Sequence, residues 1–539
     1  MINVKETLRE IINEALVELE IDNQGDFTVE IPQNKDFGDY STNVAMTLAK
    51  TMKQNPLKIA EMIIEKINNE NIKNIEIKPP GFINFFVKKS YLVENINNIL
   101  DKGVDYGRSN IGNNEKTNVE FVSANPTGLL HVGTSRCAAY GDNLCRILSF
   151  CGYDVTREYY FNDGGVQIEN LGKSLKARYE NICGIETTFP ENGYHGHEII
   201  DIAKKLYEEY KDTKLEENLE YFSEYAANYL IKIIKEDLKD FRVSFDVWTS
   251  EQKFRKDGSI ENALSKLKSE DNIYESEGAI WLKSTKYGDD KDRVLIKSDG
   301  NYTYLVPDIA YHLDKINRGY ESIINVLGAD HHGYISRLKA SIEALNFDKD
   351  KIKIKLVQMV KLLRDKKEVK MSKRTGETVT MKELMEEVGV NAARYFLAAR
   401  SVDSQMDFDI SLATKKSNEN PVYYVSYAYA RICTMLKSIN HNKKINEYTT
   451  LDNDEAYSIL EKLYLFPEVV EEAALKELPH IITNYVYELA NIFHTFYEKY
   501  RIITEDEIKT VENINLIKAV KITLENALNL IGVIPPEKM

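Results

Sequence analysis

The stretch VEFVSANPTGLLHVGTSR, residues Val119–Arg136, contains the pattern that decides the fold. Val119–Val122 is typical of a buried strand, Ala124–Leu130 contains the turn formers Asn, Pro and Gly, and Thr134–Phe150 has helical spacing. A polar turn between a strand and a helix suits phosphates, because free backbone N–H groups and the positive end of the helix dipole meet there. The stretch indicates a nucleotide site, although on its own an ordinary turn with His131 at the helix entry explains it equally well.

A second stretch favours the nucleotide interpretation. Lys370–Gly376 reads KMSKRTG and places two lysines three residues apart in a polar segment that contains a glycine. Flexible ammonium groups at this spacing suit a polyphosphate. A His-x-Gly pattern followed far downstream by KMSK is much rarer than either pattern alone.

The next strand completes a β-α-β unit. Gly152–Ile168 reads as a strand that ends at NDGG, residues Asn162–Gly165. Ligands of such sheets lie at the carboxyl ends of the strands, where HVGT and NDGG both fall. Residues of about 169–245 have the composition and spacing of an inserted helical layer, and the chain is almost wholly helical in period from about Ser401 onward.

Composition restricts the class of protein. A chain of 539 residues is too long for one core, so we expect two to four domains. Its 43% hydrophobic and 29% charged residues are typical of a soluble globular protein, and no apolar run approaches the roughly 20 residues that span a bilayer. The first 20 residues form an amphipathic, charged pattern without the apolar segment of a signal peptide, so we expect a cytoplasmic protein with no membrane partner.

The net charge and the local distribution of charge point in opposite directions as regards a nucleic-acid partner. The formal net charge of −15 argues against such a partner. Lys349–Arg374, however, holds eleven basic residues against three acidic ones, 11 − 3 = +8. Such a run is often only a solvated surface. Because this one ends in KMSK, we favour a stripe that faces phosphate.

These motifs resemble those of the class I aminoacyl-tRNA synthetases, with HVGT in the place of the HIGH signature and KMSKR in the place of KMSKS. Within that class the chain is similar to the arginyl-tRNA synthetase family over essentially its whole length. The matching segments are SANPTG, NDGG, YLVPDIAYH, GADHHGY, KMSKRTG and the terminal GVIPPEKM. The resemblance implies an α/β fold, with a Rossmann-type catalytic domain at residues 111–400, an N-terminal α+β domain at 1–110 and an α-helical anticodon-binding domain at 401–539.

The resemblance implies a reaction in two steps. The arginine carboxylate attacks the α-phosphate of ATP, and the arginyl group then moves to the terminal adenosine of tRNA(Arg). His131, Thr134, Lys370 and Lys373 are the implied catalytic residues. The implied ATP contacts are these four with Gly128, Gly133, Met371 and Ser372. Magnesium is expected as the counter-ion of ATP, without a metal site in the protein. The histidine pairs His195/His197 and His331/His332 lack a third ligand and do not change this expectation.

Recognition of arginine requires carboxylates arranged for the planar guanidinium group. Glu251, Tyr304 and Asp308 match the positions that the family uses for this purpose. Asn125 and Glu120 match the positions that hold the backbone end of the amino acid. Composition alone would leave any of these acids as a surface residue, so their roles are implied by the resemblance.

Two segments are implied to bind tRNA. KPPGFINFFV, Lys78–Val87, is similar to the part of the N-terminal domain that grips the D-loop, which makes Phe82 and Asn84 candidate base contacts. The implied anticodon surface comprises Tyr424, Tyr427, Arg431, Tyr497 and Met539. An ordinary buried strand and ordinary helix packing are the simpler explanations of the same residues. No DNA partner is expected, and the family suggests a monomer.

One departure from the family leaves alternatives open. The last position of the signature is Thr134, where the family commonly has histidine or another hydrogen-bonding residue. Threonine can cap a helix but carries no positive charge. An active arginyl ligase is the leading hypothesis. The others are a catalytically weakened relative that only binds tRNA, and a ligase for another amino acid, against which Glu251, Tyr304 and Asp308 argue.

Overall fold

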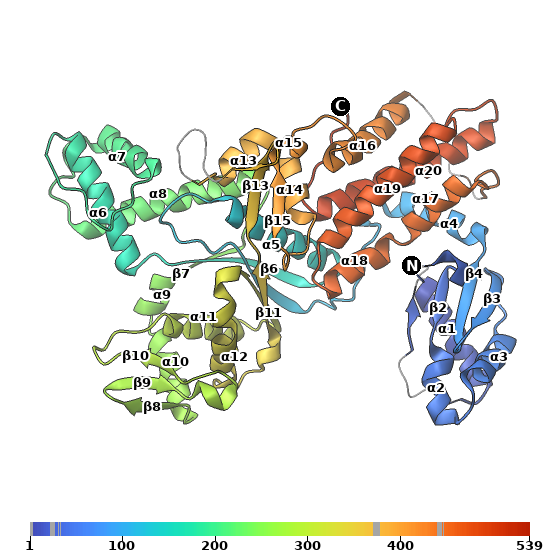
Figure 1. Ribbon diagram of the computed structural model, residues 1–539, viewed down its shortest axis with the longest axis horizontal. Helices are drawn as coiled ribbons and strands as arrows, with labels where there is room; N and C mark the ends of the chain where they lie inside the picture. The colour runs from blue at the N-terminus through green and yellow to red at the C-terminus, as the bar shows by residue number, and fades with distance from the viewer. Residues whose placement is uncertain are drawn as a thin grey trace. The chain divides into compact units, whose positions relative to one another are not determined.

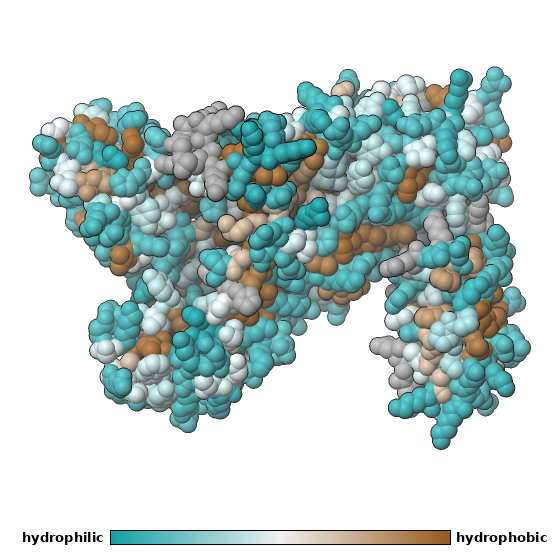
Figure 2. Space-filling view, in the orientation of Figure 1, coloured by the Kyte–Doolittle hydropathy of each residue, from teal (hydrophilic) through white to brown (hydrophobic). Residues whose placement is uncertain are grey.

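The structure is a computed structural model that describes residues 4–21, 27–30, 32, 34–369, 378–438, 445 and 447–539. The chain divides into two compact units. The first comprises residues 1–101, 441–464 and 496–519, and the second comprises residues 102–440, 465–495 and 520–539. No helix among the described residues is long and apolar enough to cross a membrane. Polar residues dominate the face seen in Figure 2, with apolar ones scattered among them.

The first unit contains an antiparallel sheet with helices on one face (Figure 1). The strand order is β1-β2-β4-β3. Side chains alternate along β4, so that Ile83, Phe85 and Val87 are buried in the core. The elements are α1 (Val4–Glu18), β1 (Val29–Glu30), β2 (Tyr40–Thr42), α2 (Val44–Met52), α3 (Pro56–Lys66), β3 (Ile72–Lys78), β4 (Phe82–Val87), α4 (Lys89–Lys102) and α17 (Asp454–Tyr464).

The second unit is built on the predicted parallel sheet. Its five strands have the order β12-β11-β5-β6-β7, and every neighbouring pair is parallel. The reversal of strand order beside β5 makes the carboxyl end of this strand the usual ligand crevice of such sheets. The strands are β5 (Lys116–Glu120), β6 (Asp154–Phe161), β7 (Val247–Ser250), β11 (Ser322–Gly328) and β12 (Ile352–Val357).

The connection after β5 differs in detail from the expected one. We expected the strand to run to Val122, but β5 ends at Glu120 because Val122 and Ser123 have left-handed backbone angles, with φ of 69° and 40°. Helix α5 (Val132–Phe150) then returns against the sheet. It packs closely at Gly141, where a β-carbon would come within 2.2 Å of the Phe121 ring.

Two insertions separate the strands of the parallel sheet. The expected helical layer consists of α6 (Gly165–Ile182), α7 (His197–Tyr210) and α8 (Leu219–Asp240), which enclose a core of their own. After β7 come α9 (Glu251–Lys256), α10 (Ser259–Ser269) and an antiparallel sheet of β8 (Ile273–Ser276), β9 (Ala279–Leu282) and β10 (Arg293–Ile296). This sheet shares its core with α11 (Leu305–Asn317) and α12 (Ile335–Glu343).

The remainder of the chain is mainly helical, as predicted. It also contains a small sheet of β13 (Val360–Arg364), β14 (Lys367–Glu368) and β15 (Met406–Asp409). The helices are α13 (Met381–Val388), α14 (Val390–Ala398), α15 (Ile410–Ala413), α16 (Pro421–Ser438), α18 (Phe466–Leu475), α19 (His480–Lys499) and α20 (Glu507–Leu530). Figure 1 shows α16 to α20 as the orange and red part of the ribbon.

Candidate active site

The histidine of the signature caps helix α5. Nδ1 of His131 accepts a hydrogen bond from the backbone N–H of Gly133 at 3.1 Å. Desolvation by the surrounding protein lowers the pKa of His131, so its ring is neutral at pH 7. A neutral ring whose Nδ1 accepts a hydrogen bond has its proton on Nε2. The remaining ring nitrogen is therefore an N–H donor beside the helix N-terminus, where a phosphate oxygen would be favoured.

The side chain of Thr134 stabilises the same helix cap. Its hydroxyl donates to the carbonyl oxygen of His131 at 2.6 Å, and the hydroxyl of Ser135 donates to the same oxygen at 3.2 Å. Gly133 approaches the imidazole so closely that a β-carbon would lie 3.0 Å from its Cε1 atom. Gly128 lies in the turn between β5 and α5. In this structure Thr134 holds the backbone of the cap, and its hydroxyl proton is already used.

The segments on both sides of KMSK are attached close to this cap. Val132 donates its backbone N–H to Val379 at 3.3 Å, and Met381 donates to Leu130 at 2.7 Å. His131 and Thr380 form a β-bridge between these two contacts. Lys370, Met371, Ser372 and Lys373 themselves lie outside the described residues.

The buried guanidinium of Arg136 in α5 donates to the carbonyl oxygens of Gln358, which precedes KMSK, and of Ser401 and Ser404, which follow it, at 2.8–2.9 Å. Val369, the last described residue before KMSK, donates to Leu362 at 2.9 Å. Two stretches more than 200 residues apart in the sequence are thus joined by hydrogen bonds at the N-terminal half of α5.

A cluster of acids and tyrosines lies at the same edge of the sheet. Glu120 ends β5, Glu251 begins α9 and Asp308 lies in the first turn of α11. The charges of all three raise the pKa of Tyr160, in addition to its burial. The ring of Tyr160 stacks on that of Tyr311 at a centroid distance of 4.5 Å. The structure therefore brings together three of the predicted arginine-binding residues from three separate elements.

Asp308 has the most perturbed carboxyl group of this cluster. Its pKa is raised to about 7, chiefly by burial; the hydrogen bond from Tyr334 lowers the pKa, and the charges of Glu251 and Glu120 raise it. Lys315, on the same helix, lowers the pKa but does not restore it. A carboxyl group that is held half-neutral at pH 7 gains most from a cationic ligand, because the ligand removes the cause of the shift.

Internal cations neutralise the other two acids of the cluster. The fully buried Nζ of Lys315 bonds to Oε2 of Glu120 at 2.6 Å and to Asn325 at 3.1 Å. Arg255 binds Oε1 of Glu251 through Nε and Nη2, at 3.0 and 2.6 Å. The three carboxylates are thus balanced by two cationic side chains of the protein, Lys315 and Arg255. The cluster therefore has a net charge of −1 when Asp308 is ionised.

The two remaining predicted arginine contacts differ in accessibility. Asn125 bridges the ends of the strands, since it accepts from the backbone of Asn162 at 3.2 Å and donates to Gln167 at 3.1 Å. Tyr304 precedes α11 and is 79% exposed, so its ring faces solvent in this structure. Tyr304 is not among the residues whose charges act on Tyr160.

Sequence reasoning missed four residues of this cluster, namely Tyr160, Tyr311, Lys315 and Tyr334. A signal existed for two of them. Tyr311 and Lys315 follow Asp308 by three and seven residues, which places all three on one face of α11. Tyr160 and Tyr334 come from separate elements, and nothing in their spacing relates them to Asp308.

The candidate base contacts of the first unit lie on the sheet face opposite the helices. Phe82 is 38% exposed, whereas Asn84 is only 1% exposed. Oδ1 of Asn84 accepts from the hydroxyl of Ser41 at 2.7 Å, and Nδ2 is buried with no hydrogen-bond partner among the described residues. A buried amide nitrogen without a partner is unusual and suits a site that is completed by a ligand.

The candidate anticodon contacts of α16 share one helix face, as predicted. Tyr424 and Tyr427 both lie against the ring of His494, at 4.5 and 5.9 Å between centroids. Arg431 donates to the hydroxyl of Tyr427 at 2.7 Å and lies 4.4 Å from the centre of its ring. Tyr497 is half-buried in α19. The contacts of α16 pack helices together, so by themselves they do not distinguish an RNA surface from a core.

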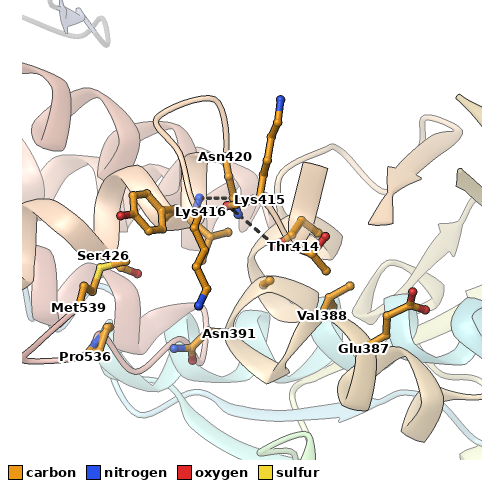
Figure 3. Close-up of a pocket in the computed structure, with 14 residues that line it drawn as sticks. Glu387, Val388, Asn391, Thr414, Lys415, Lys416, Asn420, Ser426, Pro536 and Met539 are labelled. Carbon is orange, nitrogen blue, oxygen red and sulfur yellow. Dashed lines mark hydrogen bonds between the residues drawn. The ribbon is translucent and has the colours of Figure 1, made fainter. Parts of the chain in front are cut away.

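The terminal methionine lines a cavity of about 300 Å³ beside α16 (Figure 3). Met539 is 55% exposed, and Ser426 and Pro536 lie near it at one end of the cavity. Lys415 and Lys416 come from the loop after α15; the side chain of Lys416 extends toward Asn391, whereas that of Lys415 points away and pairs with Glu419. Polar and cationic side chains around an exposed methionine are compatible with a base and its phosphate.

The basic stripe that we expected to face phosphate is partly paired with acids. Five of its cations form ion pairs in the structure. The pairs are Lys349–Glu343, Lys353–Glu477, Lys355–Glu477, Lys361–Glu368 and Arg364–Glu387. Counting charges along the sequence could not reveal this, because most of these partners lie far away in the chain. Among the residues with described side chains, no group of three or more His, Cys, Asp or Glu is arranged to hold a metal ion.

A parallel sheet of this topology, with a histidine-capped helix after its central strand and the segment that follows KMSK hydrogen-bonded beside the cap, has the features of a class I aminoacyl-tRNA synthetase. Three family models match the chain: the arginyl-tRNA synthetase N-terminal domain at residues 6–87, the class I (R) catalytic domain at 95–416 and the DALR anticodon-binding domain at 425–539. The chain belongs to the arginyl-tRNA synthetase family, whose members ligate arginine to tRNA with ATP.

Individual relatives agree with this assignment over the full length. The chain is 50% identical to an arginine–tRNA ligase of Geobacillus kaustophilus and 48% identical to one of Bacillus subtilis, and each alignment covers 99% of both chains. The arginyl-tRNA synthetase of Thermus thermophilus has the same fold, with a TM-score of 0.78 over 100% of both chains and 19% identity.

Proposed function

We propose that this chain ligates L-arginine to tRNA(Arg) in two steps, with ATP, arginine and the tRNA as substrates. An oxygen of the arginine carboxylate first bonds to the α-phosphorus of ATP while the bond to pyrophosphate breaks. A hydroxyl of the terminal adenosine then attacks the carbonyl carbon, and AMP leaves. The observation that carries the proposal is the histidine-capped turn together with the acidic cluster at one edge of the sheet, in a chain of this family.

The nucleotide end of the site is assigned to the cap of α5. Nε2–H of His131 and the backbone N–H of Thr134 in the first turn would hold phosphate oxygens, while the N–H of Gly133 is used by the imidazole. The sequence assigns Lys370 and Lys373 to neutralising the leaving pyrophosphate, with Met371 and Ser372 beside the nucleotide. Magnesium would accompany ATP as its counter-ion.

The arginine end is assigned to the cluster around Asp308. The single excess negative charge of this cluster matches the net charge of +1 on arginine. Asp308 and Glu251 would receive the guanidinium, while Glu120 and Asn125 would hold the backbone end. The planar guanidinium can bond to two carboxylates at once, whereas the ammonium of lysine presents one point charge. Tyr304 is assigned here by the family resemblance.

Contacts with tRNA are proposed at Phe82 and Asn84 in the first unit, and at the surface of α16, Tyr497 and Met539. We also propose that the protein is monomeric and acts in the cytoplasm, as its family suggests.

Pyrophosphate exchange tests the activity directly. With arginine, cognate tRNA and ATP, we expect labelled pyrophosphate to enter ATP, and lysine or glutamine to support no exchange above background. Exchange with lysine in preference to arginine would contradict the assignment of Asp308. A complete lack of exchange by a protein that still binds tRNA would favour the weakened paralogue.

Thr134→Ala should slow adenylate formation by roughly fivefold, because the loss of a hydrogen bond of about 1 kcal/mol loosens the carbonyl of the capping histidine. Thr134→Ser retains the hydroxyl and should keep most of the activity. Single-turnover kinetics with saturating arginine measure the effect. Equal rates for Thr134→Ala and the wild type would show that the cap does not need this hydroxyl.

The KM for arginine should depend on pH through Asp308. With a pKa of about 7, Asp308 is mostly protonated at pH 6 and mostly ionised at pH 8, so KM should fall by about tenfold between these values. Tyr334→Phe removes the hydrogen bond that lowers this pKa, which should move the profile to higher pH. A KM that stays constant from pH 6 to pH 8 would contradict the assignment.

The stability of the free protein should show the opposite trend. Because the pKa of Asp308 is raised in the folded state, its contribution to stability is fully present below the unfolded pKa near 4 and is lost as the pH rises through about 7.

A further inference from the structure

A second cavity, of about 390 Å³, lies at the opposite end of helix α5 from His131. Helix α5 has 19 residues and a rise of about 1.5 Å per residue, so the two ends are roughly 25 Å apart. Three arginines line this cavity, Arg108, Arg146 and Arg157, and no acidic residue does. Neutral polar groups complete the lining, among them Ser149 and Asn529. The cavity is thus positively charged and separate from the nucleotide cap.

Arg157 is the least satisfied of the three arginines. Its side chain is only 20% exposed, and its Nε is buried without a hydrogen-bond partner among the described residues. The carboxylate paired with it is Asp142, at 3.8 Å, which is longer than a hydrogen bond. Asp142 is already bound by Arg146 at 2.7 Å and by Arg394 at 2.5 Å. One carboxylate therefore serves three guanidinium groups.

The simpler explanation, that these arginines only stabilise helix ends, accounts for part of the cluster. Arg146 donates to the backbone carbonyls of Arg242 and Asn529, which lie at the ends of α8 and α20, at 3.1 and 3.4 Å. Cations at helix C-termini are favourable. Arg157 makes no such bond in the part of the chain that is described. Arg108 lies over the ring of Phe150 at 4.6 Å and pairs with the exposed Asp105.

We propose that this cavity binds the phosphate groups of a small ligand such as a diphosphate. Phosphate oxygens accept two parallel hydrogen bonds from a guanidinium group, and a ligand with two or more negative charges supplies the counter-charge that the cluster lacks. Arg157 would bind from the inner side and Arg108 from the rim, with Ser149 able to donate a further hydrogen bond. The site does not depend on the proposed catalytic activity.

Calorimetric titration of the full chain with pyrophosphate tests the proposal. We expect two binding events, one at the nucleotide cap and one at this cavity. Arg157→Gln should weaken the second event by about tenfold or more, as is typical for loss of a charged hydrogen bond, and Arg108→Gln should weaken it less because Arg108 is exposed. His131→Ala should leave the second event unchanged.

A matched control is Arg178→Gln, since Arg178 also lies over a phenylalanine, Phe189, but in the helical insertion. It should leave both events unchanged. If Arg157→Gln does not fold, Arg108→Gln still decides the question. A single event that is lost in His131→Ala and unaffected by Arg157→Gln and Arg108→Gln would overturn the proposal. Competition with tRNA distinguishes a free phosphate ligand from the phosphates of the RNA backbone. If pyrophosphate stays bound to the cavity when tRNA is added, the ligand is a free small molecule. If tRNA displaces pyrophosphate from the cavity, the site binds the RNA backbone and the small-ligand assignment is overturned.

Discussion

Asp308→Asn should raise the KM for arginine by about thirtyfold or more while leaving the protein folded. The guanidinium would lose a charged partner in a desolvated pocket, and truncating one partner of such a pair typically costs about 2–5 kcal/mol. The substrate would also face one negative charge fewer, because Lys315 and Arg255 already neutralise Glu120 and Glu251. Steady-state kinetics of arginine activation measure the effect.

The folding of this variant provides an internal control. Burial favours the neutral form of Asp308, and asparagine is neutral at every pH, so the melting temperature at pH 8 should be equal to that of the wild type or higher. Asp314→Asn is a matched variant on the same helix, where the carboxylate pairs with Arg318 at 2.9 Å outside the acidic cluster. Its KM should be unchanged. A KM for Asp308→Asn within threefold of the wild-type value would remove Asp308 from the arginine site.

The sequence predicted the architecture because the relevant patterns are local. The strand before Asn125, the helix after His131 and the second strand before Asn162 each have their own periodicity, and a β-α-β unit follows from their order. The exact end of β5 was not predictable. Val122 has strong strand propensity, yet it takes a left-handed conformation, and propensity does not record such tertiary constraints.

The site was predictable only where a motif or a helix period connects its residues. His131 and the segment after KMSK form one hydrogen-bonded arrangement, as the two motifs together indicated. The role of Thr134 was predicted only in part. The sequence indicated that Thr134 could cap the helix, but not that its hydroxyl would donate to the carbonyl oxygen of His131. Tyr334 and Arg255 could not be assigned, because what they do depends on the positions of Asp308 and Glu251 in space.

Lys315→Met should lower the free energy of unfolding by about 3–5 kcal/mol, the usual cost of removing one partner of a buried ion pair. Lys315 is fully buried, and its removal would leave the carboxylate of Glu120, which is only 6% exposed, without its cationic partner, while the hydrogen bond from Ser123 at 3.0 Å remains. Urea unfolding at pH 8 measures the loss. A suitable control is Lys355→Met, because its partner Glu477 keeps a second lysine and the pair is partly exposed, so a loss below about 1 kcal/mol is expected.

The same variant tests the assignment of Glu120 to the amino end of arginine. If Glu120 receives the α-ammonium group, bound arginine replaces part of the missing cation in Lys315→Met. Saturating arginine should then stabilise this variant by more than it stabilises the wild type, because a ligand that binds only the folded state adds its binding free energy to stability. The double variant Glu120→Gln/Lys315→Met has no unpaired carboxylate and should recover much of the lost stability, but not the additional response to arginine. If arginine stabilises Lys315→Met and the double variant equally, Glu120 pairs with Lys315 for structural reasons alone, and the ammonium group of the substrate must be held elsewhere.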